Sequence, residues 1–240
     1  EWAYDPPRQL PPPERRPPPA PPKPARRSGP PTTFDVSWRT APVTIDGSLE
    51  ASEWFGLQPE AALIIETNVD GTPVAPPCIA WMARDDETLW VGISVHLPES
   101  LAVRPGTEWK RHDAVEVAFR PATDRGAAEP VRVLRGFTDG TFVSSEEAGM
   151  TAADARKLAA GVRYAARRID EQRWTAEWAI PLDDLGVPRK KSREPVTVPF
   201  NLTVRQPARN AWVMWADTHS FSWQVQNAGR LRLPGPNPNK

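Results

Sequence analysis

Proline accounts for 13 of the first 31 residues, and the chain then changes abruptly to alternating sequence rich in tryptophan. Proline lacks the amide N–H that helices and sheets need, and its ring fixes φ near the polyproline II value. Residues 1–31 therefore cannot build a core, and we expect a stiff, extended arm there. Residues 32–233 can bury apolar surface and are expected to form one domain, followed by a disordered tail at 234–240.

The charge of the chain is balanced, with 30 basic and 30 acidic residues. The arm has six basic and three acidic residues and hence a charge of +3, which leaves −3 for the remainder. Neither part is basic enough to indicate nucleic-acid binding, so no nucleic-acid partner is expected. The arm's charge suits solubility, or attachment to an acidic protein surface or to anionic headgroups, so peripheral membrane association stays open. No apolar run reaches the 18 residues of a membrane span.

The domain reads as short strands separated by turns, because apolar side chains alternate with polar or small ones in many segments. A helix is expected at 151–160, with a single helical turn at 182–186. Strands are predicted at 43–45, 61–67, 78–83, 88–95, 114–119, 131–137, 141–143, 162–167, 173–180, 196–204, 212–216 and 230–233. Ten or more short strands with little helix predict an all-β, antiparallel β-sandwich.

Motifs that carry catalysis are missing from the sequence. It contains no nucleophile elbow, no zinc-binding helix and no glycine-rich phosphate loop. The three histidines, His96, His112 and His219, are far apart in sequence, and the paired acidic residues fall in predicted turns. The single cysteine, Cys78, excludes an internal disulfide without fixing the compartment. We therefore expect a protein that is not an enzyme.

Tryptophan is the most unusual part of the composition, with 11 in 240 residues. Flat aromatic rings pack on the apolar C–H face of a sugar while nearby polar groups bond its hydroxyls, the usual logic of a concave binding site. Trp109, in the loop at 105–111, and Trp223, in a polar stretch, are expected to be exposed. The strand patterns instead favour core positions for Trp38, Trp54, Trp81, Trp90, Trp174 and Trp178.

Seven segments, in order along 43–233, resemble the motifs of family 9 carbohydrate-binding modules. They are 45–54 (IDGSLEASEW), 89–91 (LWV), 109–119 (Trp109, then DAVEVAF), 174–181 (WTAEWAIP), 200–204 (FNLTV), 215–217 (WAD) and 229–233 (GRLRL). The resemblance implies a jelly-roll-like, non-catalytic β-sandwich, secreted or in the bacterial periplasm.

The resemblance also implies a site. Trp109 and Trp223 match the two tryptophans that sandwich a terminal sugar, and Glu116 and Arg132 match the residues that bond its hydroxyls. Calcium often supports the family's fold and stays possible here, but no acidic cluster is assigned to it, so the expectation is that no cofactor is bound.

The chain departs from the family's pattern at several positions of this site. Leu134 stands where an asparagine is expected, and Ala228 stands where a phenylalanine is expected. One extra residue separates Trp109 from Asp113, and 95–98 lacks the usual Asp-Pro. An unmatched polar group costs roughly 1–3 kcal/mol, so these changes leave the scaffold better preserved than the site.

Two alternatives stay open. In the first, the chain is a structural accessory subunit of a larger bacterial complex, membrane-bound or not, with residues 1–31 contacting a protein partner, since a polyproline II segment docks at little entropic cost. In the second, it is a haem-binding redox subunit, with axial ligands from Met82, Met150, Met214 or His219. The sequence names neither the sugar, nor the protein partner, nor the oligomeric state.

Overall fold

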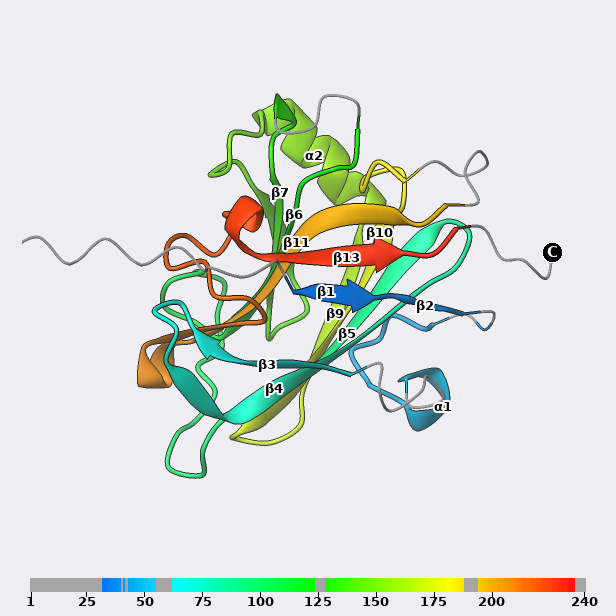
Figure 1. The fold of residues 1–240 in the computed structure, drawn as a ribbon. Coiled ribbons are helices and arrows are strands. Elements are labelled where there is room, and N and C mark those ends of the chain that lie inside the picture. The colour runs from blue at the N-terminus through cyan, green and yellow to red at the C-terminus, as the bar shows by residue number, and fades with distance from the viewer. Residues whose placement is uncertain are drawn as a thin grey trace, which may run out of the picture.

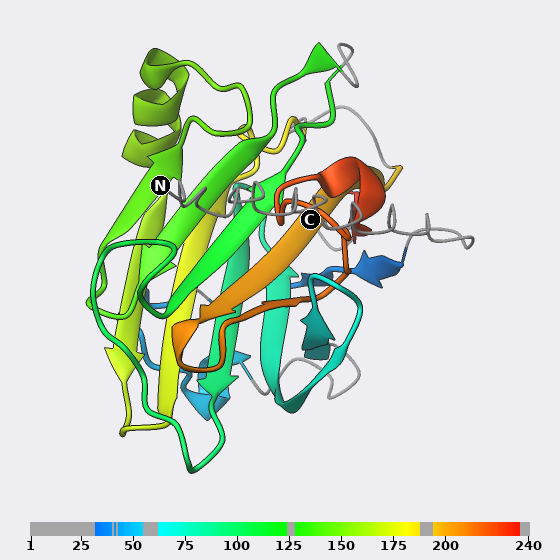
Figure 2. The ribbon, with the colours of Figure 1, turned by 90° about the vertical axis from the view of Figure 1, so that its left-hand side faces the viewer.

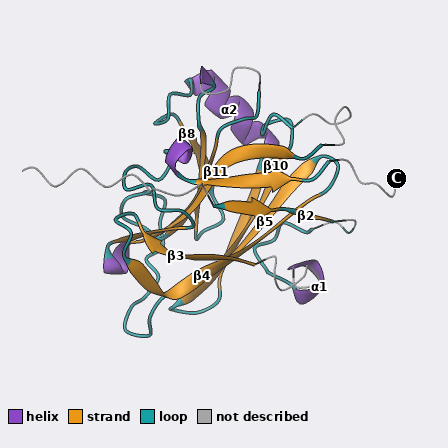
Figure 3. Cartoon of the chain, in the orientation of Figure 1, coloured by secondary structure: helices purple, strands orange, loops and turns teal. Residues whose placement is uncertain are grey.

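The computed structural model describes residues 32–39, 41, 43–54, 62–123, 128–187 and 194–235. The predicted arm at 1–31, and 236–240 of the predicted tail, lie outside these ranges. Strands are the main regular secondary structure of the described residues (Figure 3). Its elements are β1 (Thr33–Asp35), β2 (Ser37–Trp38), α1 (Ala51–Trp54), β3 (Ala62–Asn68), β4 (Pro73–Arg84), β5 (Thr88–His96), β6 (Ala114–Phe119), β7 (Arg132–Phe137), β8 (Phe142–Ser145), α2 (Ala152–Gly161), β9 (Arg163–Arg168), β10 (Arg173–Pro181), β11 (Val196–Gln206), η3 (Pro207–Arg209), β12 (Ala211–Met214), η4 (Val225–Asn227) and β13 (Gly229–Leu233).

The strands form two packed layers (Figures 1 and 2). One layer contains β8, β7, β6, β11 and β13, with β1 beside β13, and the other contains β3, β4, β5, β10 and β9. β12 pairs with both β11 and β3 and so joins the layers into one continuous sheet. Among the described strands, every pairing is antiparallel except β1 with β13 and β2 with β4. The prediction of an antiparallel all-β sandwich is confirmed.

Alternation along the strands decides which side chains fill the space between the layers. Val117 of β6 and Trp174 and Trp178 of β10 point inward and are 0% exposed. The residues that alternate with these inward-pointing ones along each strand point to the outer face of their own layer. They include Glu116 of β6 and Glu177 of β10. Both of these carboxylates are nevertheless 0% exposed.

Helix α2 confirms the predicted helix within one residue at each end. Thr151 is its N-cap, and the Thr151 Oγ1 accepts a hydrogen bond from the Asp154 N–H at 3.1 Å. The expected turn at 182–186 is present, and Gly186 ends it with a φ of +71°.

The predicted strand at 43–45 is wrong, since this segment has no regular secondary structure. Side chains, and not a neighbouring strand, accept backbone amides of this segment and of the turn that follows it. The Thr44 N–H donates to Glu53 Oε1 at 3.2 Å, and the Asp46 N–H donates to Glu177 Oε2 at 3.0 Å. Three residues are too few for an alternating pattern to distinguish a strand from a loop whose amides bond to side chains. The short strands β1 and β2 were not predicted for the same reason.

The predicted core tryptophans are confirmed with one exception, Trp38, which is half-buried. Its indole N–H donates to the Gly235 carbonyl at 3.0 Å, and Arg84 Nη1 donates to the Pro234 carbonyl at 2.8 Å. The first two residues of the predicted tail are thus held against β2 and β4. The five fully core tryptophans are Trp54, Trp81, Trp90, Trp174 and Trp178.

Candidate functional site

A polar cluster lies on the outer face of the layer that contains β6, β7 and β11. In the antiparallel register, Glu116 of β6 lies between Arg135 of β7 and Thr203 of β11. All three side chains point away from the core because their neighbours along each strand, such as Val117 and Leu134, point into it. Each of the three is at most 5% exposed. Burial of an arginine and a glutamate together is unusual unless the two are paired.

Glu116 and Arg135 form a buried ion pair. Arg135 Nε donates to Glu116 Oε2 at 2.8 Å, and Arg135 Nη2 donates to Glu147 Oε2 at 2.7 Å. Burial raises the pKa of Glu116, although Arg135 opposes this and the nearby Ser222 hydroxyl also lowers it. Glu116 Oε1 accepts no hydrogen bond of ordinary geometry from the described residues, and the same holds for the neighbouring Thr203 Oγ1. Two polar atoms at the centre of this face therefore have hydrogen-bonding capacity left.

Trp109 forms one side of the cluster. The Arg135 Cζ lies 4.7 Å from the centroid of the Trp109 ring, within cation–π distance. Trp212 meets the Trp109 ring nearly edge-on, with centroids 5.1 Å apart and planes at 69°. Arg205 in turn lies 4.6 Å from the centroid of the Trp212 ring. Trp109 is half-buried and not freely exposed, because these contacts hold it in place.

The loop that carries Trp109 is anchored at both ends. Asp113 Oδ2 accepts the Arg104 N–H at 2.8 Å, and Arg205 Nη2 donates to the Lys110 carbonyl at 3.0 Å. Asp113 is 0% exposed, and burial raises its pKa to about 6. A fixed loop presents its aromatic ring without an ordering cost on binding.

Trp223 forms the other side. It packs on a small apolar cluster that includes Ala118 and Val133, the outward neighbours of Glu116 and Arg135 along their strands. Phe221 stacks on Trp223 with ring centroids 5.3 Å apart and planes at 7°. Trp223 is thus half-buried as well, and the ring with the larger exposure is Phe221, at 63%. Sequence reasoning missed Phe221, whose only signal was its place two residues before Trp223.

The structure places Arg132 away from the other three predicted site residues. Arg132 and Arg135 are three positions apart on β7, so their side chains leave opposite faces of the strand. Arg132 Nη1 bonds to Asp184 Oδ1 at 2.7 Å, at the edge of the core. Arg135 is the arginine that bonds Glu116, and it is the residue that the sequence-based assignment overlooked. The two arginines are distinguished only by the pairing register of β6 with β7, which places Arg135 and not Arg132 opposite Glu116.

The outer face of the second layer carries a matching buried carboxylate, Glu177. Its Oε2 accepts the N–H groups of Asp46 and Gly47 at 3.0 and 2.7 Å, and its Oε1 accepts the indole N–H of Trp54 at 2.8 Å. Gly92 lies beneath the Trp54 ring, where a Cβ would approach ring atoms to 2.9 Å. The motif at 45–54 is thus bonded to the motif at 174–181, and both belong to the scaffold.

A cleft of about 310 Å³ lies beside this anchor, between 48–50 and the end of β9. Arg167 and Arg168 line it, and Arg167 Nη1 donates to the Ser48 hydroxyl at 2.8 Å. None of the residues lining this cleft is aromatic, so it offers no flat surface for a sugar ring. The Glu116 face is the better candidate.

Within the described ranges, no group of three or more histidine, cysteine or acidic side chains is arranged to hold a metal ion. None of the helices there is long and apolar enough to cross a membrane.

Comparison with solved structures identifies the fold. A carbohydrate-binding module of family 9 from Caldicellulosiruptor kristjanssonii matches both with cellotriose and with glucose bound, at a TM-score of 0.63 and 17% identity. The match covers 87% of this chain and 96% or 99% of the other. A structure from Bacteroides uniformis matches at a TM-score of 0.59 and 12% identity, covering 85% and 99% of the two chains. The fold is that of a family 9 carbohydrate-binding module. No protein-family model matches the sequence, and neither does any curated protein.

The family 9 fold accounts for the positions of the collinear motifs. Six of the seven resembling segments lie on strands or on the Glu177 anchor, so they are tied together by packing and hydrogen bonds. At such low identity the similarity establishes the fold alone, and the site has to be argued from its own side chains.

Proposed function

We propose that this chain is a non-catalytic carbohydrate-binding module whose ligand lies over Glu116 and Arg135. The observation that supports the proposal is the unsatisfied Glu116 Oε1, buried at the centre of a sheet face. A carboxylate oxygen that lacks a donor is costly to bury, and a sugar hydroxyl would supply one. Rings stand on both sides of it: Trp109 on one side, and Phe221 and Trp223 on the other.

The polar pair gives the proposed site its selectivity. Arg135 donates and Glu116 accepts, so adjacent hydroxyls of one sugar can meet a donor and an acceptor at fixed positions. Glu147 holds the far end of the Arg135 guanidinium, so the donor is oriented before any ligand arrives. The rings supply apolar contact to the C–H face of the sugar. Most small-molecule sites likewise combine apolar walls with a few polar groups that fix orientation.

Calorimetric titration of the full chain with glucose, cellotriose and xylo-oligosaccharides tests the proposal. Glu116→Gln, Arg135→Lys and Trp109→Ala are expected to weaken binding at least tenfold. Arg132→Lys is the matched control, because it makes the same exchange on the opposite face of the same strand, and its affinity should stay within twofold of wild type. A wild-type chain that binds none of these saccharides, or equal losses for Arg132→Lys and Arg135→Lys, would refute the proposal.

We also propose that the module acts outside the cytoplasm, in the periplasm or secreted, since its proposed ligands are sugars of the envelope or surroundings. Fractionation of the native cells, with the chain followed by antibody, tests this. A chain found wholly in the cytosol contradicts it.

The role of an accessory subunit remains a proposal that rests on the sequence of 1–31. Purifying the native complex with and without these residues tests it, and loss of a co-purifying partner is the expected result. The haem and calcium alternatives are tested by absorbance in the Soret region and by thermal unfolding with and without a chelator.

A further inference from the structure

Phe221 is an exposed ring in an unusual position. Of the large hydrophobic side chains in the described ranges that are exposed, it has the largest exposed fraction, 63%. The ring lies parallel to Trp223, at 7° and with a centroid separation of 5.3 Å, so it covers one face of that indole. Arg135 similarly lies over a face of Trp109. Each of the two tryptophans of this site therefore has one face covered by another side chain of the protein.

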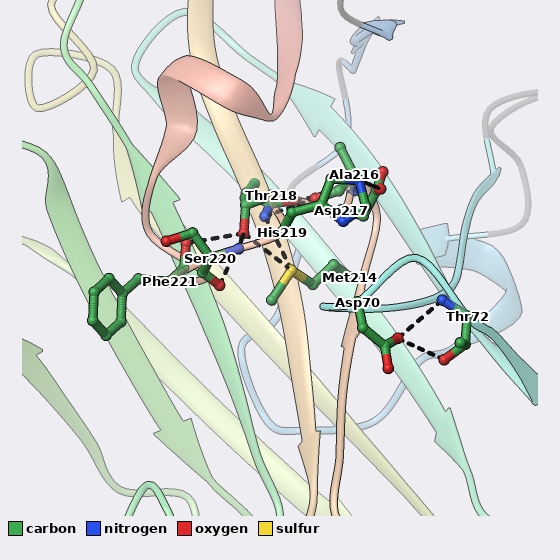
Figure 4. A network of polar contacts seen from close by, with 10 residues as sticks. Asp70, Thr72, Met214, Ala216, Asp217, Thr218, His219, Ser220 and Phe221 are labelled. Atoms are coloured by element: carbon green, nitrogen blue, oxygen red, sulfur yellow. Dashed lines mark hydrogen bonds and ion pairs between the residues drawn. The ribbon is translucent and has the colours of Figure 1, made fainter. Parts of the chain in front are cut away.

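The backbone beneath Phe221 is fixed. The Phe221 carbonyl accepts a hydrogen bond from Thr218 Oγ1 at 3.1 Å and from the Gln224 N–H at 3.0 Å. Figure 4 shows this loop, with the Phe221 ring pointing away from the network around Thr218 and Met214. Asn201 Nδ2, buried on β11, donates to the next carbonyl, that of Ser222, at 3.1 Å. The backbone that presents the exposed Phe221 ring is thus fixed by hydrogen bonds to its own carbonyl and to that of Ser222.

We propose that Phe221 is the ligand-contacting ring on this side of the site, and that Trp223 stacks behind it and supports it. The inference rests on the proposed function and specifies its ligand class. A slot between two bare indoles would accept only the end of a sugar chain. A ring displayed at the surface stacks on any unit along a chain, so the ligand is the side of a neutral polysaccharide. Its units are pyranoses with mostly equatorial hydroxyls, because these present a flat apolar face.

The chemistry of the loop fits this ligand. Ser222 lies between the two stacked rings in sequence, and its hydroxyl is near enough to Glu116 to lower the pKa of that carboxyl. The Phe221 ring and the Glu116 carboxylate are thus linked through one intervening residue. A sugar unit on the ring would have hydroxyls directed at the polar pair, and its neighbours along the chain would continue across the surface.

Substitutions at Phe221 test the inference with affinity gel electrophoresis in hydroxyethyl cellulose and in soluble xylan. Phe221→Ala is expected to weaken retention by polysaccharide about tenfold, the scale of a lost aromatic contact. Phe221→Leu should lose nearly as much, since it keeps the apolar surface but lacks the flat ring, while Phe221→Trp should keep it. Ile169→Ala, which truncates a similarly exposed side chain outside this site, is the control and should bind as wild type does.

The chain-side ligand is tested with competitors. Cellohexaose reduced at its end to the alditol should compete with polymer as well as the unreduced oligosaccharide does. Glucose should compete at least tenfold less well than cellohexaose. If glucose competes as well as cellohexaose, or if reduction abolishes competition, the site binds chain ends and the inference is overturned.

Failure of the inference about Phe221 can be distinguished from failure of the proposed function. If Glu116→Gln abolishes binding while Phe221→Ala leaves it unchanged, the proposed function survives and the role of Phe221 is wrong. A wild-type chain that binds no saccharide overturns both. Thermal unfolding of each variant separates lost binding from lost folding, and Phe221→Ala should unfold within a few degrees of wild type because its ring is mostly exposed.

Discussion

Glu177 and Glu116 occupy matching places on the two layers, each buried on an outer face, yet their hydrogen bonds differ. Glu177 accepts three N–H groups through its two oxygens. Glu116 bonds Arg135 through one oxygen, and its other oxygen has no partner of ordinary geometry among the described residues. Burial raises the pKa of both. Glu177 has both oxygens hydrogen-bonded at ordinary distances, whereas Glu116 has only the Ser222 hydroxyl beside it in addition to Arg135, and this hydroxyl lowers its pKa.

The difference supports a structural role for Glu177 and the proposed binding role for Glu116. A buried acceptor that the protein satisfies completely stabilises the native state, because its removal leaves several donors unpaired. A buried acceptor that the protein leaves partly unsatisfied costs stability, and such a cost is typical of functional sites. Glu177 bonds Trp54 and the turn at Asp46 to β10, whereas Glu116, which is also 0% exposed, is the carboxylate that we propose a ligand contacts.

The largest expected effect is the contrast between Glu177→Gln and Glu116→Gln. An amide at position 177 points its NH₂ group at donors, so at least one donor is left unpaired, and we expect a loss of about 3 kcal/mol of unfolding free energy. At position 116 the amide oxygen still accepts from Arg135, and the Arg135 charge keeps its second partner, Glu147, so the loss should be smaller, about 1 kcal/mol. Urea denaturation at pH 7 measures both.

Binding should show the opposite order, with Glu116→Gln losing affinity and Glu177→Gln retaining it at temperatures where it is folded. Equal losses of stability for the two variants would remove the distinction between the two carboxylates.

Asp113 is an intermediate case and the source of the next largest effect. Its Oδ2 accepts the Arg104 N–H, its Oδ1 has no partner among the described residues, and burial raises its pKa to about 6. Because the folded pKa lies above the ordinary value of about 3.9, the folded state binds the proton more tightly. Stability therefore falls as pH rises between about 4 and 6.

Asp113→Asn removes this titration. Relative to wild type, the variant should gain about 2 kcal/mol between pH 4 and pH 7. Denaturation of both proteins across this range measures the difference and cancels the other carboxylates. Parallel curves for the two proteins would show that Asp113 titrates normally.

Gly92 tests the packing of the Glu177 anchor. An added Cβ would lie 2.9 Å from Leu49 Cδ2 and from two atoms of the Trp54 ring, so Gly92→Ala should cost about 1.5 kcal/mol. The double variant with Leu49→Ala should lose less than the sum of the two single variants, because the shorter side chain makes room. Additive losses in denaturation would show that Leu49 is not the obstacle.

The sequence predicted the parts of this molecule that follow from repeated local patterns. Alternation predicted the sandwich and its core, and the threonine at 151 predicted α2. The irregular segment at 43–45 was mistaken for a strand because side chains, and not a neighbouring strand, hold it and the turn after it. Glu53 accepts the Thr44 N–H, and Glu177 accepts the Gly47 N–H from 130 positions away. Short-range patterns carry no information about such a bond.

The candidate site was predicted only in part, for a related reason. Arg135 differs from Arg132 only in which face of β7 it leaves, and that depends on how β7 pairs with β6. Phe221 lies on an irregular loop where no periodicity marks its exposure. The positions of both residues are set by contacts between distant segments.

The smallest expected effect concerns Glu147, the exposed partner of Arg135. Its side chain is 53% exposed, and the hydrogen bond from Arg135 lowers its pKa. A lowered pKa contributes stability above the ordinary value of about 4.3, and this contribution is lost as pH falls through the folded pKa. Solvent screening reduces it, so Glu147→Gln should cost about 0.5 kcal/mol at pH 7 and nothing at pH 3.

Urea denaturation at the two pH values measures the stability term, and titration with cellotriose measures the affinity. Arg135 keeps its bond to Glu116 in this variant, so affinity should fall less than threefold, far less than for Glu116→Gln. If Glu147→Gln instead abolishes binding, the exposed carboxylate is itself a ligand contact. The unsatisfied oxygen of Glu116 would then no longer explain where the sugar binds.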